Sequence, residues 1–456
     1  MNRLAQSSLV LALVGCQGST VEVGQLDEVL EMPTIPNRDI DMLFVIDNSP
    51  SMLDKQTAMI ASFPKMMDAL GTLDGGLPNL HIGVVTSDMG TKGSMDSSPG
   101  PSIGSGPGQC TGHGDDGALQ HYDGAVPAPE LGGALYISDL GNADGSRTRN
   151  YTGELRDVFT KIASVGANGC GFEQHFASMR RALGNPANGD FVRPTAGLAV
   201  VIVADEDDCS MSHSTMIGAD VTTLGPLLSF RCTRFGIECD DGGATTDAMN
   251  QVGPKAACHP RADSAYVEDV QPFVDFLSTL KGDPRGVMVA AIAAPAAPVE
   301  IELRTPAGGG TAVPALAHSC MYTGTDGLTQ VGDPAVRIHA LVDAFPNRGS
   351  FSTVCSDDLS LSLSSVGYTA KKLVGDPCID TALADTSAAP GLQPLCEVLD
   401  GTEPTPACDG TNLDHCWQVV TDPATCSAAD HLRFELLRTT PPVAQSYVSV
   451  RCVRAS

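Results

Sequence analysis

The fold is decided by the stretch Asp41-Met42-Leu43-Phe44-Val45-Ile46-Asp47-Asn48-Ser49-Pro50-Ser51-Met52. An apolar run of strand length ends in Asp47, and two hydroxyl residues, Ser49 and Ser51, follow it. Such a run is typical of a strand that is buried on both faces of a parallel sheet. Because open α/β sheets bind ligands at the carboxyl ends of their strands, these three polar residues lie where a ligand is expected.

The three polar residues form a set of hard oxygen donors. One carboxylate and two hydroxyls at positions i, i+2 and i+4 share a single turn and suit Mg²⁺, Mn²⁺ or Ca²⁺. The alternative is that Asp47 only caps the following helix, a common role for an acidic residue. The order of buried strand, donor triplet and amphipathic helix favours a divalent-cation site.

Further strands are predicted at residues 80–86, 198–204 and 287–294, which are apolar runs separated by segments of helical periodicity. Right-handed crossovers through these helices make the strands parallel. Residues 134–138 are expected to form an antiparallel edge strand. The predicted fold class is therefore α/β, with a mostly parallel, Rossmann-like sheet flanked by helices over residues 37–375.

Three long insertions, rich in turn-forming residues or cysteine, interrupt this domain near residues 90–133, 206–264 and 295–333. If the buried strands are parallel, their carboxyl ends share one rim. The roots of all three insertions then lie on that rim, together with Asp47 and with Asp205, which directly follows the strand at 198–204.

The Asp-x-Ser-x-Ser pattern resembles the metal-ion-dependent adhesion site (MIDAS) of von Willebrand factor A (vWA) domains. The resemblance implies that a Thr in a helix–helix loop and an Asp after the fourth strand complete the site, and Asp205 matches that Asp. The loop at residues 168–174 contains no Thr. Glu173 in this loop is the residue that could reach the ion or a bridging water. Over residues 38–456 the chain looks like vWA-domain lipoproteins of myxobacteria and their relatives.

The implied activity is binding, and we expect no enzymatic function. A carboxylate of a protein or surface ligand would fill an open position on the cation, as in adhesion. One alternative is a structural envelope protein with a degenerate vWA scaffold and no metal-dependent ligand. Another is a metallohydrolase that uses His113 and His121, but nothing in the sequence places a general base beside a nucleophile.

The first residues have the features of an export signal. Arg3 precedes a short apolar segment, and the sequence Leu13-Val14-Gly15-Cys16 resembles the bacterial lipobox. We therefore expect residues 1–15 to be a signal peptide, Cys16 to carry a lipid anchor and residues 16–36 to form a tether from the membrane. The absence of Asp after Cys16 points to the outer membrane of the cell envelope.

Charge and cysteine content support an exported protein. The 27 basic and 54 acidic residues give a net charge of −27, which disfavours binding to nucleic acid. Of the 15 Cys, 14 remain when Cys16 is set aside, and none forms a Cys-x-x-Cys pair, so up to seven disulfides are expected. Six of these Cys lie in residues 376–456, which predicts a small Cys-rich module containing β-strands.

Overall fold

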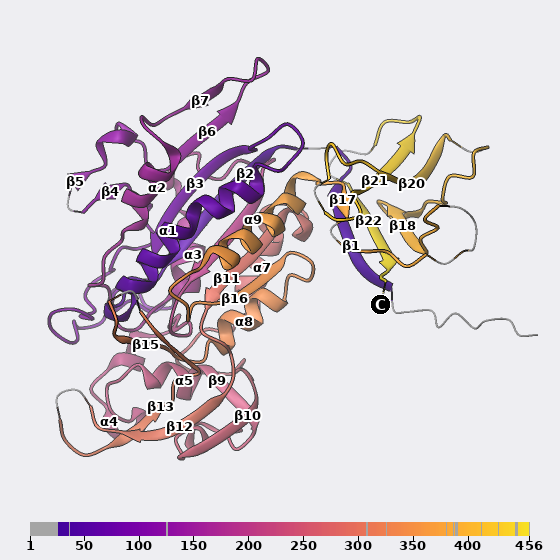
Figure 1. Cartoon of the computed structure of the whole chain (residues 1–456). Coiled ribbons are helices and arrows are strands. Elements are labelled where there is room, and N and C mark those ends of the chain that lie inside the picture. Colours follow the sequence, from indigo (N-terminus) through magenta and orange to yellow (C-terminus); the bar gives the residue numbers. More distant parts are fainter. Residues whose placement is uncertain are drawn as a thin grey trace, which may run out of the picture.

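A seven-stranded sheet forms the centre of the larger part of the molecule (Figure 1). The computed structural model describes residues 26–455 except for 36, 125, 307–308, 325, 380, 386, 388–390, 412, 427 and 443–445. The strands, in order across the sheet, are β16 (Gly349–Thr353), β11 (Val287–Ala293), β8 (Gly197–Val203), β2 (Asp39–Ile46), β3 (Asn79–Thr86), β6 (Ile137–Gly141) and β7 (Arg147–Arg149).

The first five strands of this order pair in parallel, and the sequence predicts this for four of them, β2, β3, β8 and β11. The expected antiparallel edge strand is present as β6, although it begins at Ile137 and not at residue 134. A further antiparallel edge strand, β7, was not predicted. Its sequence Arg147-Thr148-Arg149 is short and polar, so it carries no strand pattern.

Helices cover both faces of the sheet. Side chains of β2 alternate between the faces: Met42, Phe44 and Ile46 pack in one core, whereas Leu43 and Val45 pack in the other. The first core is closed by α1 (Leu53–Leu70), α2 (Leu155–Ala163) and α9 (Ser360–Val374). The second is closed by α3 (His175–Gly184), α7 (Gln271–Leu280) and α8 (Val336–Asp343).

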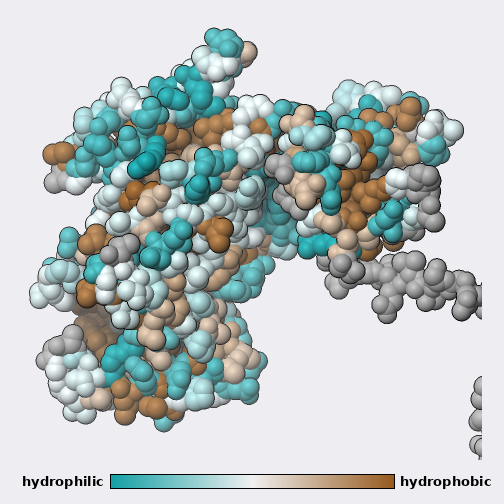
Figure 2. Space-filling view, in the orientation of Figure 1, coloured by the Kyte–Doolittle hydropathy of each residue, from teal (hydrophilic) through white to brown (hydrophobic). Residues whose placement is uncertain are grey.

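The insertions build a separate layer at the carboxyl ends of the parallel strands (Figure 1). A four-stranded sheet joins β9 and β10 of the second insertion to β12 and β13 of the third, in the order β13-β12-β10-β9. The elements of this layer are β9 (Ile237–Asp241), β10 (Gly253–Pro260), β12 (Val299–Arg304), β13 (Val313–Leu316), β14 (Cys320–Thr323), β15 (Thr329–Gly332), α4 (Val221–Leu224), α5 (Phe230–Gly236) and α6 (Thr246–Met249). Leu303 of β12 is 60% exposed, and the end of the molecule that holds β12 and β13 shows a brown, apolar surface in Figure 2.

The remaining short elements lie in loops. They are the hairpin strands β4 (Tyr122–Asp123) and β5 (Val126–Pro127), and the 3-10 turns η1 (Pro50–Met52), η2 (Pro129–Leu131), η3 (Pro186–Asn188), η4 (Ser214–Ile217) and η5 (Pro284–Gly286). Within the described residues, no helix combines the length and apolar character required to cross a membrane.

The Cys-rich module contains two small sheets. One has the order β1-β22-β18-β19 and the other β17-β21-β20. Their strands are β1 (Leu26–Pro33), β17 (Cys378–Ile379), β18 (Cys396–Asp400), β19 (Glu403–Pro404), β20 (His415–Thr421), β21 (Leu432–Arg438) and β22 (Tyr447–Val453).

The presence of β1 in this module corrects the prediction that residues 16–36 form only a tether. Residues 26–33 pair antiparallel with β22, and Figure 1 shows the indigo strand beside the yellow one. Leu30 and Met32 are buried in the core of the module, and this burial stabilises the strand. Cys16 and the predicted signal peptide lie outside the described residues.

The described residues contain seven disulfides, and the cysteine count predicts up to seven. Three close the terminal module and four lie in the larger part. They are Cys110–Cys170, Cys209–Cys232, Cys239–Cys258, Cys320–Cys355, Cys378–Cys426, Cys396–Cys452 and Cys408–Cys416.

Candidate metal centre

The loop after β2 is held in a fixed turn around Asp47, whose side chain is fully buried. Its Oδ1 accepts hydrogen bonds from the Ser49 backbone N–H at 2.7 Å and the Ser87 hydroxyl at 3.4 Å. The Gln56 amide of α1 donates to the Asp47 carbonyl oxygen at 2.9 Å. The carboxylate therefore stays at the end of the strand and does not turn out to cap α1.

The structure brings Asp47, Ser49, Ser51 and Asp205 into one cluster. Strands β2 and β8 are in register up to Ile46 and Val203, so the residues that follow them lie side by side. The Ser49 and Ser51 hydroxyl oxygens are 3.1 Å apart, and the Ser51 side chain lies near the Asp205 carboxylate. Burial and the nearby charge of Asp47 raise the pKa of Asp205 to about 6.

Two carboxylate oxygens of this cluster are buried without a hydrogen-bond partner. They are Asp47 Oδ2 and Asp205 Oδ1. Roughly nine in ten buried polar groups in proteins have a partner, because leaving one unpaired costs free energy. Carboxylate and hydroxyl oxygens are also the donors that a hard divalent cation prefers. The residues present therefore fit such an ion.

Lys55 is a member of the cluster that the sequence did not reveal. Its ammonium Nζ lies 2.9 Å from Asp205 Oδ2, and the two side chains are 0% and 2% exposed. The same Nζ donates to the Ser51 carbonyl oxygen at 3.1 Å. The signal in the sequence is the position of Lys55 one helical turn after Ser51, on the face of α1 that meets the loop.

His175 is a second neighbour of the cluster that was not predicted. Its Nε2 lies 3.7 Å from Asp47 Oδ2, beyond hydrogen-bonding distance, and both side chains are fully buried. Burial alone would lower the pKa of His175, but Asp47 and two nearby acidic residues raise it. An imidazolium at this position would offset part of the negative charge of Asp47.

Glu173 lies beside the cluster, but its carboxyl group is close to that of Glu206, and both residues line one cavity. Burial, together with the charges of Glu206 and Asp47, raises the pKa of Glu173 well above its usual range. Glu173, Glu206, Asp207 and Asp333 line a cavity of about 210 Å³. In the described structure, Glu173 thus pairs with another acid and contributes to the wall of a neighbouring cavity.

The loop that lacks the expected Thr packs directly against the donor turn. The Gly169 backbone N–H donates to the Asn48 carbonyl oxygen at 2.7 Å. A Cβ atom on Gly169 would lie 2.0 Å from Asn48 Oδ1, so a larger residue at this position would require the Asn48 side chain to move. The disulfide Cys110–Cys170 fastens the same loop to the first insertion.

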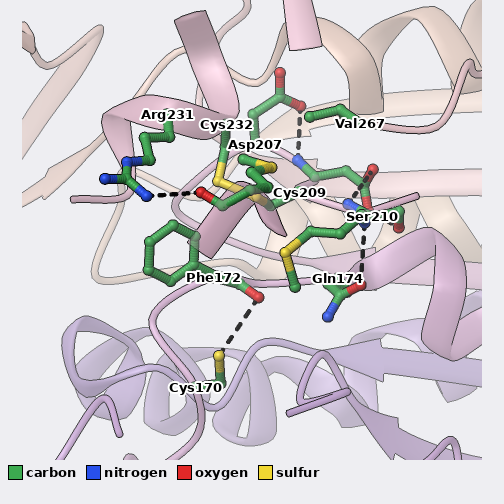
Figure 3. The surroundings of a disulfide bond; sticks show 12 residues. Cys170, Phe172, Gln174, Asp207, Cys209, Ser210, Arg231, Cys232 and Val267 are labelled. Carbon is green, nitrogen blue, oxygen red and sulfur yellow. Dashed lines mark hydrogen bonds between the residues drawn. A yellow bond between two sulfur atoms is a disulfide. The ribbon is translucent and has the colours of Figure 1, made fainter. Parts of the chain in front are cut away.

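A second disulfide, Cys209–Cys232, fixes the chain just beyond Asp205. Figure 3 shows it between Asp207 and Phe172, with Arg231 at its side. The Gln174 side chain accepts a hydrogen bond from the Met211 backbone N–H at 3.1 Å. The carboxyl end of β8 and the loop before α3 are thereby joined.

Within the described ranges, no group of three or more His, Cys, Asp or Glu residues is arranged to hold a metal ion. The donor set around Asp47 contains only two carboxylates, and its other oxygens belong to serine. The acidic residues near His113 and His121 are engaged elsewhere: Asp116 pairs with Arg181 at 2.8 Å and Asp123 with Lys161 at 2.8 Å.

Comparison with known proteins finds distant likenesses to solved structures. No family model and no curated protein matches the chain. One similar structure is a von Willebrand factor type A protein from Catenulispora acidiphila, with 10% identity, coverage of 95% of this chain and 67% of that chain, and a TM-score of 0.28.

Another similar structure is the pilus adhesin RrgA from Streptococcus pneumoniae. Identity is 10%, coverage is 96% of this chain and 59% of that chain, and the TM-score is 0.28. This chain thus spans less than two thirds of the adhesin's length. The resemblance to lipoproteins of myxobacteria gains no support from these matches.

Proposed function

We propose that this chain is a binding protein built on a von Willebrand factor A-like scaffold and dependent on a divalent cation. Asp47, Ser49, Ser51 and Asp205 would hold Mg²⁺, Mn²⁺ or Ca²⁺. When bound, the cation supplies an electrophilic position that a carboxylate of a protein or surface ligand can fill. The insertions around the rim would determine which ligand gains access.

One observation carries this proposal: two buried carboxylate oxygens, Asp47 Oδ2 and Asp205 Oδ1, have no hydrogen-bond partner. They belong to a cluster whose other oxygens are the hydroxyls of Ser49 and Ser51, 3.1 Å apart. A divalent cation would satisfy both carboxylates. It would also offset the burial of Asp205 and its repulsion by Asp47, which together raise the pKa of Asp205.

The place of action that we propose is the cell envelope. The lipobox-like sequence that ends at Cys16 supports export and a lipid anchor, and seven disulfides fit an oxidising compartment. The sequence pattern favours the outer membrane. Globomycin treatment of expressing cells tests this point, because it should leave the precursor of a lipoprotein unprocessed. A Cys16→Ser variant should in addition remain unlipidated.

Calorimetric titration of the purified protein with Mn²⁺ tests the cation site. We expect a single-site isotherm that Asp47→Asn and Asp205→Asn each abolish, because each removes a charged ligand while preserving side-chain shape. Asp68→Asn is the matched control, since Asp68 lies on α1 with its side chain 71% exposed. An unchanged isotherm in both site variants would refute the proposal.

Retention on a carboxylate-bearing resin tests the binding step. We expect the wild-type protein to be retained in Mn²⁺ and released by EDTA, and the Asp47→Asn variant to be retained no better in Mn²⁺ than in EDTA. Equal retention of the wild-type protein in both buffers would argue against cation-dependent capture.

The second candidate is a structural envelope protein in which this site holds no metal. The observation that favours it is the presence of two basic side chains at the cluster, Lys55 beside Asp205 and His175 beside Asp47. These groups could offset the buried negative charge by themselves. The absence of a Mn²⁺ isotherm, together with identical thermal unfolding in Mn²⁺ and EDTA, would assign the protein to this class.

A further inference from the structure

The buried ammonium of Lys55 lies beside Asp205, one of the proposed ligands of the cation. Its ammonium is 2.9 Å from Asp205 Oδ2 and its side chain is fully buried. The Tyr322 ring of β14 lies next to it, with the ring centroid 6.0 Å from Nζ. The Tyr322 hydroxyl donates to Asp54 Oδ2 at 2.9 Å, which fixes the hairpin β14–β15 against the first turn of α1.

When no divalent cation is bound, the ammonium of Lys55 compensates the negative charge of the buried Asp205. A buried Asp205 without a cationic partner would be strongly unfavourable, and Lys55 supplies that partner. The Lys side chain has three donors and no acceptor, so it cannot coordinate a metal ion. It therefore has no favourable contact to make with a cation bound at the same carboxylate.

A divalent ion and the ammonium of Lys55 cannot both be held close to Asp205 without cost. Two positive charges a few ångström apart in a buried site repel one another much more strongly than in water. Asp205 has one negative charge to share between them. Ser51 lies at both partners, because its carbonyl oxygen accepts from Lys55 and its side chain is near Asp205.

We infer that Lys55 is an intramolecular competitor of the divalent cation: its ammonium holds Asp205 in the metal-free state and leaves it when the ion binds. This inference rests on the proposed function and adds a regulatory element to the same site. The affinity for the cation is then set by an exchange of partners on Asp205, and a long, flexible side chain can make that exchange without unfolding α1.

The first test is calorimetric titration of the full chain with Mn²⁺ in the Lys55→Met variant. Methionine keeps most of the volume of the lysine stem and removes the charge. We expect Mn²⁺ to bind to this variant at least about tenfold more tightly than to wild type, because the buried Lys55–Asp205 pair no longer has to be broken. Lys65→Met is the matched control, since Lys65 lies on the same helix with its side chain 57% exposed; its affinity should equal that of wild type.

Each outcome of this titration is decisive. Equal or weaker binding in Lys55→Met, with normal binding in wild type, overturns the inference and leaves the proposed function intact. Binding in neither protein overturns both. Binding in Lys55→Met but not in wild type supports the inference and shows that the ammonium blocks the site completely.

A second test uses the wild-type protein and so does not depend on the folding of a variant. Acetylation by an amine-reactive ester is measured at each lysine by mass spectrometry, with Mn²⁺ or with EDTA. Lys55 should be protected in EDTA and labelled severalfold faster in Mn²⁺, whereas exposed Lys65 should react equally in both. Equal protection of Lys55 in both conditions would overturn the inference.

Discussion

The guanidinium of Arg337 and the carboxylate of Asp208 form an ion pair that is closed to solvent. Nη2 and Oδ2 are 3.0 Å apart, and the side chains are 1% and 0% exposed. Arg337 also donates to the carbonyl oxygens of Asp208 and Glu268, at 3.1 and 2.7 Å. A single side chain of α8 therefore fixes the root of the second insertion, three residues beyond Asp205.

Replacement of Arg337 by Met should destabilise the protein by about 3–5 kcal/mol, because Asp208 would remain buried without its cationic partner. Urea denaturation measures this change. Arg304→Met is the control, since its side chain is 38% exposed and pairs with Glu302 at the surface; a loss below about 1 kcal/mol is expected there. Similar losses in the two variants would contradict the prediction.

Removal of the disulfide Cys110–Cys170 should weaken both stability and cation binding. The bridge spans 60 residues, so its loss costs up to about 4 kcal/mol in the chain-entropy account. Replacing both cysteines by serine also frees the loop at Gly169 that packs on Asn48. We expect weaker Mn²⁺ binding by calorimetry. The corresponding double variant of Cys408–Cys416, which lies in the terminal module, should leave the Mn²⁺ affinity unchanged.

Asp96 should contribute stability that is lost in acid. Burial alone would raise its pKa, but hydrogen bonds from Ser214, His213 and Gly93 outweigh that effect and lower the pKa to about 2. Because the folded-state pKa lies below that of the unfolded chain, the contribution is complete above about pH 4 and disappears as the pH falls through about 2.

The Asp96→Asn variant tests this contribution. After allowance for solvent screening, it should lose on the order of 1 kcal/mol at pH 7 relative to wild type, and the difference should shrink between pH 4 and pH 2. Chemical denaturation at a series of pH values gives both quantities. A difference that does not change with pH would show that the carboxylate charge is not responsible.

Strand β1 should be required for a stable terminal module. Leu30 is 6% exposed in the module core, and Leu30→Ala should cost about 2–5 kcal/mol. Hydrogen exchange of the β22 amides should accelerate, while exchange in β2 and β8 should not change. Ile35→Ala, at a side chain that is 51% exposed, is the control and should leave β22 protected.

The parallel strands could be predicted because their burial on both faces requires continuous apolar sequence. The run from Met42 to Ile46 is fully buried, and its alternate side chains enter different cores. Strand β1 could not be predicted in the same way. Its partner β22 is more than 400 residues away in the sequence, and the acidic residues Asp27, Glu28 and Glu31 obscure its apolar face.

Residues of the candidate site could be predicted only where their type is typical of metal ligands, as for the carboxylates. Asp47 and Asp205 each follow an apolar strand, so their meeting follows from topology. The position of Lys55 one helical turn after Ser51 is a weak signal, because a lysine in the first turns of an amphipathic helix usually faces solvent. The pairing of Glu173 with Glu206 depends on the path of two loops, which local sequence does not determine.

The pairing of Leu26 with Val453 has a consequence for the maturation of the chain. A polypeptide that is synthesised amino end first delivers β1 more than 400 residues before the strand that pairs with it. Until then β1 has an unpaired edge, which a chaperone or a neighbouring molecule could engage. The terminal sheet, in which Cys396–Cys452 joins β18 to β22, can therefore close only after β22 has been synthesised.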